Sequence, residues 1–175
     1  MKIDVGCGSK KRGQDYIGVD IYPYPGVNIV HDVETGLPFK DNEIDEIYTS
    51  HFLEHTKDFV STMEEFYRVL KPGGILEVIV PHWATCVAHT EFHLRFFRFH
   101  SFDEFDTKYN KSFKTSEKAK FKILERKFSY KHNPLISPYS IAMEFISNIF
   151  PTRFDNWLSR FLPPTEIYFK MEAVK

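Results

Sequence analysis

A run of small and acidic residues near the start of the chain has the residue types and spacing of a nucleotide-binding turn. In the stretch DVGCGSKKRGQDYIGVD, Asp4 precedes Gly6 and Gly8, and Asp20 closes the stretch. Glycines let the backbone approach a ligand closely, and an acid at the end of a strand accepts hydrogen bonds from ribose hydroxyls. The stretch therefore predicts a binding site for a ligand that contains a nucleoside.

Three ligands are compatible with such a turn, and two of them fail on particular residues. A dinucleotide fingerprint has a third glycine where this chain has Lys11, and its acid comes later than Asp20 does. Gly8 and Gly13 have the spacing of a phosphate-binding P-loop, but the lysine and hydroxyl residues that must follow are missing. Asp4 would repel a pyrophosphate and suits a cation. S-adenosylmethionine, a sulfonium nucleoside without phosphate, fits best; the alternative left open is a turn shaped by glycines without a ligand.

A second group of reactive residues lies in PHWATCVAHTEFHLRFFRFH, residues 81–100. In an open parallel sheet the ligand lies at the carboxyl ends of the strands, so a segment that leaves a strand faces the reacting group. We predict His82 and His93 as general bases. Two alternatives remain: a zinc site of Cys86, His89 and His93 with His82, whose spacing matches no standard ligand pattern, and surface histidines beside a phenylalanine core. The prediction is that the chain has no metal site.

The elements that must position these residues follow from the apolar patterns. Strands are expected at 2–5, 16–20, 27–30, 44–49 and 75–80, with an amphipathic helix at 57–70 that Pro72 and the two glycines after it should end. Strands that alternate with crossovers predict a parallel sheet. Only about ten residues separate the first two strands, roughly the minimum for a crossover. We therefore expect one or two turns of helix there, not a full helix.

The second half of the chain has a different pattern. Strands are expected at 121–130 and 165–174, and the segment 135–162 between them carries two aromatic helical faces. Insertions of this length are usually functional. We expect 135–162 to have a core or lid role and to close the cleft beside Ser9–Arg12, with a dimer interface or a membrane surface as alternatives.

The composition of the chain limits the classes of protein to which it can belong. A chain of 175 residues is long enough for one hydrophobic core, and its 42% hydrophobic content includes no apolar run long enough to span a membrane. Two cysteines give no disulfide framework, and no export signal precedes the first strand, so a cytoplasmic location is expected. A net charge of -1 makes nucleic acid an unlikely partner.

Four stretches together resemble a known family. DVGCG, YIGVDI, HDVETGLPFKDNEIDEIYTSHFLEHTKD and EEFYRVLKPGGILEVIVPH, within residues 1–82, resemble the class I S-adenosylmethionine-dependent methyltransferases, most closely the small methyltransferase type 11 group with an L-E-H motif. The resemblance implies a Rossmann-like α/β fold, with a mostly parallel seven-stranded sheet, an antiparallel last strand and a helical insertion before it. It also implies one domain, with a cofactor half at 1–82 and an acceptor half at 83–175.

The resemblance also implies which residues bind the cofactor, S-adenosyl-L-methionine. They are Asp4, Gly6, Cys7 and Gly8 along the methionine part, Asp20 and Ile21 at the ribose and adenine, Asp32 and Val33 at the adenine edge, Ser50 and His51 over the methionine end, and His55 of the L-E-H signature. Glu54 and His55 could equally cap the following helix. The chain departs from the family at Ser9-Lys10, where many members have another glycine and a long helix.

Methyl transfer from a sulfonium is an in-line displacement, so the protein mainly aligns the acceptor and excludes water. The expected acceptor is a small molecule, a glycan or a lipid-linked compound, and a homodimer is possible. Small family members resemble His93-x-Arg95-x-Phe97, which supports His93 as a base. Two alternatives are a non-catalytic methyltransferase-like interaction subunit and a nicotinamide-dependent oxidoreductase, which Lys11 argues against.

Overall fold

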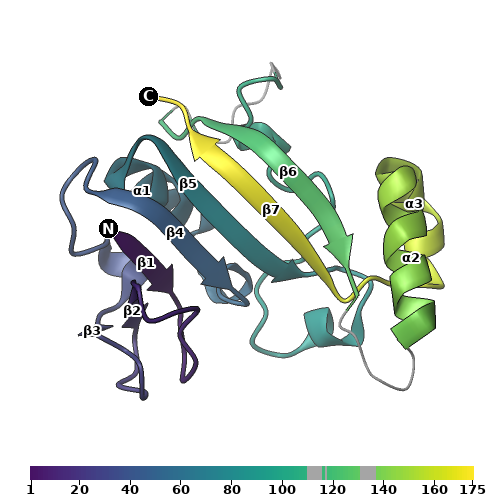
Figure 1. The fold of residues 1–175 in the computed structure, drawn as a ribbon, viewed down its shortest axis with the longest axis horizontal. Helices are drawn as coiled ribbons and strands as arrows, with labels where there is room; N and C mark the ends of the chain where they lie inside the picture. The colour runs from purple at the N-terminus through teal and green to yellow at the C-terminus, as the bar shows by residue number, and fades with distance from the viewer. Residues whose placement is uncertain (110–115, 117, 131–136) are drawn as a thin grey trace.

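A computed structural model describes residues 1–109, 116, 118–130 and 137–175 and shows a seven-stranded sheet with the order β3-β2-β1-β4-β5-β7-β6 (Figure 1). The strands are β1 (Lys2–Val5), β2 (Tyr16–Asp20), β3 (Ile29–Val30), β4 (Ile44–Ser50), β5 (Leu70–Pro81), β6 (Phe121–Ser129) and β7 (Glu166–Ala173). The first five strands pair in parallel, and β7 pairs antiparallel with both β5 and β6. The predicted mostly parallel sheet with an antiparallel last strand is confirmed.

One face of the sheet is covered by α1 (Phe59–Val69). Asp58 caps this helix by accepting a hydrogen bond from the Ser61 N–H at 2.9 Å, so Glu54 and His55 do not have the capping role that was left open. Met63 and Phe66 of α1 are fully buried against the apolar side of the strands. The helix ends at Val69, within one residue of the expected end before Pro72, but β5 begins at Leu70 rather than at 75, so that proline lies inside the strand.

Phenylalanines from the second half complete this core. Phe59 of α1 makes edge-to-face contacts with Phe97, Phe102 and Phe105, with ring centroids 5.6–5.7 Å apart. Phe102 also packs on Phe169 of β7 at 4.5 Å. The segment 97–105 therefore takes the place of a covering helix on this face of the sheet.

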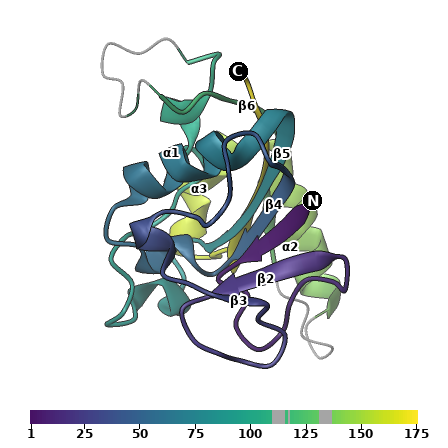
Figure 2. The same cartoon turned by 90° about the vertical axis from the view of Figure 1, so that its left-hand side faces the viewer.

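The opposite face, which Figure 1 presents to the viewer, carries no helix over β1, β4 and β5 in the described part of the chain. The view from the side shows α1 on one side of these strands only (Figure 2). Residues 6–15 contain no helix, so the expected one or two turns are absent. Arg12 of this loop lies over the Tyr48 ring at 4.0 Å and pairs with Glu77 at 2.8 Å. A cation and polar strand residues replace the apolar helix contact that parallel sheets usually have.

The helices at the far end of the sheet are α2 (Ser137–Ile149) and α3 (Pro151–Asn156), followed by a 3-10 turn at Leu158–Arg160. Polar side chains of α2 face inward: Asn148 bonds both the N–H and the carbonyl of Phe128, at 2.8 and 3.0 Å, and Glu144 accepts from the Tyr130 N–H. These contacts protect the edge of β6, where backbone groups would otherwise be unpaired.

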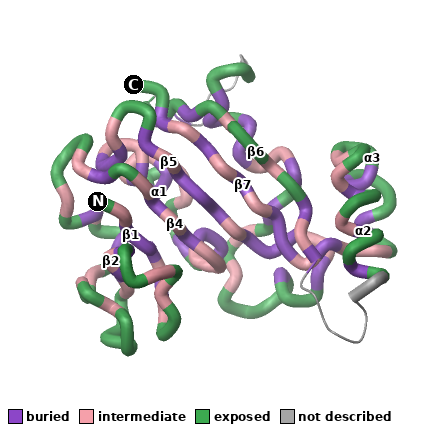
Figure 3. The backbone as a smooth tube through the Cα atoms, viewed as in Figure 1, coloured by how far each residue is buried: buried purple, intermediate pink, exposed green. Residues whose placement is uncertain are grey.

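Most large apolar side chains of this region are exposed, although Met143 and Phe154 are buried; Figure 3 colours much of α2 and α3 as exposed. The exposed ones are Tyr139, Ile141, Phe145, Ile146, Ile149, Phe150, Trp157, Leu158 and Phe161; we call these residues the apolar surface of α2–α3. The core role expected for segment 135–162 is therefore wrong for them, although residues 135 and 136 lie outside the described part. Among the described residues, no helix combines the length and apolarity needed to cross a membrane.

Candidate functional site

A cleft of about 430 Å³ lies at the carboxyl ends of β1, β2 and β4, a volume in the range of small-molecule sites. Open parallel sheets place their ligands at this edge. Residues that the sequence proposed for the cofactor line it: Gly6, Asp20, Ile21, Asp32, Val33, His51 and His55. The sequence therefore located the cleft and much of its wall.

Gly6 forms the floor of the cleft directly after β1. Its φ of +69° is left-handed, and a Cβ at this position would lie 2.6–2.7 Å from three atoms of Phe52. Only glycine satisfies both conditions. The N–H of Gly6 donates to the Val19 carbonyl at 2.9 Å, which ties the turn to β2.

Asp20 ends β2 and presents a carboxylate to the cleft. One of its oxygens accepts from the Gly8 N–H at 2.9 Å and the other from the Tyr22 N–H at 3.0 Å. A carboxylate has about four acceptor sites, so after these two bonds each oxygen keeps a lone pair. The backbone thus fixes the orientation of Asp20 and leaves it able to accept the two hydroxyls of a ribose.

The segment after β3 supplies the wall beyond Asp20. Asp32 begins a 3-10 turn, Val33–Thr35, by accepting from the Glu34 N–H at 3.0 Å, and Val33 is buried behind it. His31 bonds the Gly36 carbonyl at 2.6 Å and closes this turn. Tyr22 and Tyr24 of the β2–β3 loop also line the cleft and give it exposed aromatic surface.

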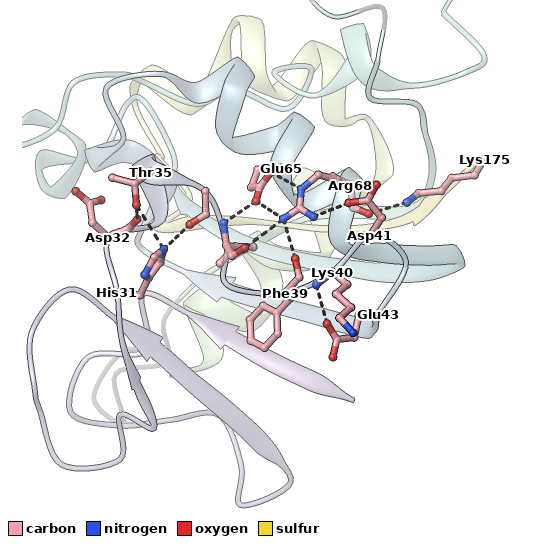
Figure 4. A network of polar contacts seen from close by, with 12 residues as sticks. His31, Asp32, Thr35, Phe39, Lys40, Asp41, Glu43, Glu65, Arg68 and Lys175 are labelled. Carbon is pink, nitrogen blue, oxygen red and sulfur yellow. Dashed lines mark hydrogen bonds and ion pairs between the residues drawn. The ribbon is translucent and has the colours of Figure 1, made fainter.

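Helix α1 holds this wall in place through a polar network (Figure 4). Glu65 accepts from the Leu37 N–H at 2.6 Å, and Arg68 donates to the Leu37 and Phe39 carbonyls at 3.2 and 3.0 Å. Arg68 also pairs with Glu65 and Asp41, at 2.6 Å each. The 37–41 segment therefore needs no helix of its own to fix the position of the cleft wall.

His51 lies at the end of β4 with a left-handed φ of +53°. Its Nε2 lies 2.7 Å from Glu166 of β7, and its Nδ1 lies 3.3 Å from Glu54. The hydrogen bond with Glu166 and then the nearby Glu54 carboxylate raise the pKa of His51 to about 9, against the opposing effect of burial. A cationic imidazole therefore stands at the β4 end of the cleft.

Asp4, Cys7, Gly8 and Ser50 were also expected to contact the cofactor, but they do not line the cleft. Asp4 is 2% exposed and accepts from the Arg12 N–H at 2.7 Å, and burial raises its pKa to about 6. Cys7 is buried beneath Gly18, where its sulfur would meet an added Cβ at 2.8 Å. These two side chains shape the loop; Gly8 acts through its N–H to Asp20.

His82 is not a general base in this structure. Its side chain is 0% exposed, its Nε2 lies 2.8 Å from Asp155 of α3, and its Nδ1 accepts from the Ala84 N–H at 3.2 Å. Burial opposes ionisation of Asp155, but the hydrogen bond with His82 and the charge of Arg98 outweigh it and lower the Asp155 pKa. Both nitrogens of His82 are engaged, so its role is to attach α3 to the end of β5.

The zinc alternative from the sequence is not assembled either. Cys86 is exposed, His89 bonds the Trp83 carbonyl at 2.8 Å, and His82 is enclosed. His93 instead lies against His55, with ring centroids 4.7 Å apart. His55 lines the cleft, so His93 stays a candidate base beside it.

The α2–α3 helices do not reach the cleft, which corrects the expectation that they close it. Sequence reasoning also missed Tyr22, Tyr24 and Phe52. The aromatic pair around Pro23, directly after the acid of β2, was a signal for the first two. Phe52 gave no comparable signal, because its importance depends on packing over Gly6.

Comparisons with known proteins agree with this geometry. Residues 3–78 match the family model described as a methyltransferase domain. A demethylmenaquinone methyltransferase of Staphylococcus saprophyticus is 29% identical over 108 residues, which is 56% of this chain and 46% of that protein. The corresponding enzyme of Listeria welshimeri is 36% identical over 63 residues, 33% of this chain and 27% of that protein. The chain thus matches less than half of the length of these relatives.

Solved structures match almost the whole chain. A Haloferax volcanii methyltransferase, solved in complex with the Trm112 methyltransferase activator, has a TM-score of 0.64 at 18% identity, covering 99% of this chain and 82% of that one. The YcgJ protein of Bacillus subtilis has a TM-score of 0.61 at 14% identity, covering 99% and 91%. At these identities the likeness is one of fold.

Proposed function

From the premise that this chain is a class I S-adenosylmethionine-dependent methyltransferase by family and by fold, we propose that it transfers the methyl group of that cofactor to a lipid-linked or otherwise apolar acceptor. The observation that carries the proposal is the pre-formed Asp20 carboxylate at the edge of the cleft. It is held by two backbone N–H groups, and its free lone pairs match a ribose diol.

Each part of the cofactor has a chemically suitable surface. The ribose binds Asp20, and the adenine lies between the exposed side chain of Tyr22 and the Asp32–Val33 segment. The methionine part extends over Gly6 toward His51, whose ring lies between the Glu54 and Glu166 carboxylates, so this end of the cleft suits the cationic groups of the cofactor. When bound, the cofactor supplies an activated methyl group, so the protein's own contribution is to orient both reactants and exclude water.

The apolar surface of α2–α3 supports an apolar acceptor. Trp157 and Phe161 are 78% and 81% exposed, whereas α2 turns its polar residues inward. Contiguous apolar patches of this kind mark surfaces that bind apolar partners. Arg153 and Arg160 are its exposed charges, while Asp155 of α3 is buried against His82. A lipid-linked compound that rests on this surface would bring its polar end toward the β5 and β7 ends, beside His51.

The test is a transfer assay with S-adenosylmethionine labelled in its methyl group. The protein is incubated with separated lipid, glycan and small-molecule fractions of a cell extract, and Asp20→Asn is the control for cofactor-dependent labelling. We expect label in the lipid fraction, lost with Asp20→Asn. Label in the other fractions alone would contradict the acceptor class, and no label in any fraction would contradict methyl transfer.

The second candidate function is a non-catalytic subunit that keeps the fold and binds a partner chain. The helix-free sheet face favours it, because parallel sheets are normally covered on both faces. The Haloferax volcanii protein was itself solved in complex with an activator chain. This candidate predicts cofactor binding without label transfer in the assay above.

A further inference from the structure

Three potential metal ligands meet beside the cleft, in a place that the cofactor does not explain. One ligand atom each of Glu54, His55 and His93 lies within 4.8 Å of the other two. Two imidazoles and a carboxylate form the donor set of several catalytic zinc sites. Among the described residues, no other set of three or more histidine, cysteine or acidic side chains comes together in this way.

The chain positions this cluster by joining two segments far apart in sequence. Glu54 and His55 belong to the 3-10 turn Leu53–His55 after β4. The Leu94 N–H donates to the Glu54 carbonyl at 2.8 Å, which brings the neighbouring His93 to the same point. Arg95 then donates to the Thr56 and Lys57 carbonyls and fixes the segment there.

The carboxylate of Glu54 is the unusual member of the cluster. Its side chain is 0% exposed, yet neither carboxylate oxygen has a hydrogen-bond partner among the residues that the structure describes. Its ion-pair partner in the described part of the chain is His51, whose Nδ1 lies 3.3 Å away. A buried carboxylate without hydrogen bonds is costly, and such a group needs a specific reason in a folded protein.

The hydrogen bonds of His55 and His93 leave one nitrogen of each ring available as a metal ligand. Nδ1 of His55 lies 3.1 Å from the Phe92 carbonyl, and Nδ1 of His93 lies 3.2 Å from the Ala88 carbonyl. A carbonyl only accepts, so each Nδ1 carries a proton, and in the neutral form of the ring Nε2 keeps a lone pair. Metal-binding histidines typically donate their second ring N–H to a carbonyl in this manner.

We propose that Glu54, His55 and His93 form a binding site for one divalent first-row transition-metal ion of the zinc class. The site explains the buried carboxylate, because the ion gives its oxygens the direct bond that His51, 3.3 Å away without a hydrogen bond, does not provide. His51 then supports the carboxylate from behind, as ligating carboxylates are usually supported. Three protein ligands leave one coordination position open, and His55 places that position at the wall of the cleft.

Two consequences distinguish this site from the function proposed above. The site requires neither cofactor nor methyl transfer, so metal binding can be present when transfer is absent. An imidazole that binds a metal has no lone pair for a proton, so the ion would remove His93 as a general base and offer a Lewis acid to an acceptor oxygen.

The test measures Zn²⁺ affinity by competition with a chromophoric chelator, together with the absorption spectrum of the Co²⁺-loaded protein. We expect one Zn²⁺ per chain in metal-depleted wild-type protein. His93→Ala and His55→Ala should each weaken binding at least about tenfold, since even losing a supporting residue costs that much. His89→Ala is the matched control: His89 is a neighbouring histidine that bonds the Trp83 carbonyl, and its removal should leave the affinity unchanged.

Glu54→Gln gives an independent readout if an alanine variant folds poorly. It keeps the shape of the side chain but removes its charge, and it should weaken Zn²⁺ binding. Mg²⁺, which prefers oxygen ligands, should raise the melting temperature of the wild-type protein much less than Zn²⁺ does. No Zn²⁺ binding to the wild type, or equal weakening by His89→Ala and His93→Ala, would overturn the proposal.

Discussion

Gly6 and Gly8 form a matched pair that tests how the cleft floor is built. Both have left-handed backbone conformations, with φ of +69° and +54°. An added Cβ at Gly6 would lie 2.6 Å from Cδ2 of Phe52 and 2.7 Å from its Cβ and Cγ, whereas at Gly8 it would meet nothing within 4 Å. The two alanine variants therefore share the conformational cost and differ in the steric one.

The magnitudes follow from these contacts. A left-handed alanine costs about 1–2 kcal/mol, part of which is offset because alanine makes the unfolded chain less flexible. Gly8→Ala should thus lower the free energy of unfolding by about 1 kcal/mol. Gly6→Ala adds an overpacking cost of about 1–3 kcal/mol. Rotating the Phe52 ring cannot remove that cost, because the Cβ of Phe52 is itself one of the close atoms.

The assay is urea unfolding of both variants and the wild type, with free energies from linear extrapolation. We expect Gly6→Ala to be less stable than Gly8→Ala by about 2 kcal/mol. Equal destabilisation within about 0.5 kcal/mol, the usual spread for independent sites, would refute the reasoning that Phe52 defines the cleft floor.

Two further predictions concern the supports of the site and of α2. Burial in the folded protein raises the Asp4 pKa from 3.8 to about 6. The folded protein therefore binds the Asp4 proton more tightly than the unfolded chain does. The free energy of unfolding falls as pH rises from about 4 to about 6, where Asp4 ionises. Asp4→Asn should therefore gain up to about 3 kcal/mol over the wild type between pH 4 and 7, measured by urea unfolding across pH; a difference that does not vary with pH would contradict this. Asn148→Ala should speed hydrogen exchange of the Phe128 amide and destabilise the protein by about 1–3 kcal/mol, because that amide loses its acceptor. Unchanged exchange there would show that α2 does not protect the β6 edge.

Local patterns were enough to predict much of the fold. The strands at 2–5, 16–20 and 165–174 were placed almost to the residue, because buried strands have short apolar or alternating patterns. The loop after β1 was predicted only in part. Its length excluded a long helix, but nothing local indicated that Arg12 would reach Tyr48 and Glu77.

The site was predictable where one segment determines it. Gly6 and Asp20 lie in one short segment of the chain, after β1 and at the end of β2, and both line the cleft. His82 was misassigned because its partner, Asp155, lies on a helix late in the chain and buries it. The cluster of Glu54, His55 and His93 was missed for a similar reason: only the folded loop brings His93 to the L-E-H turn.

The central claim is that this cleft binds S-adenosylmethionine through Asp20, and isothermal titration calorimetry tests it most directly. The wild type should bind one cofactor per chain. Asp20→Asn should weaken binding about 10- to 150-fold, the loss expected for hydrogen bonds to a charged group. Asp15→Asn makes the same substitution at an exposed residue just before β2 and outside the cleft, and should leave the affinity unchanged. No binding to the wild type, or equal affinities for the two variants, would contradict the account.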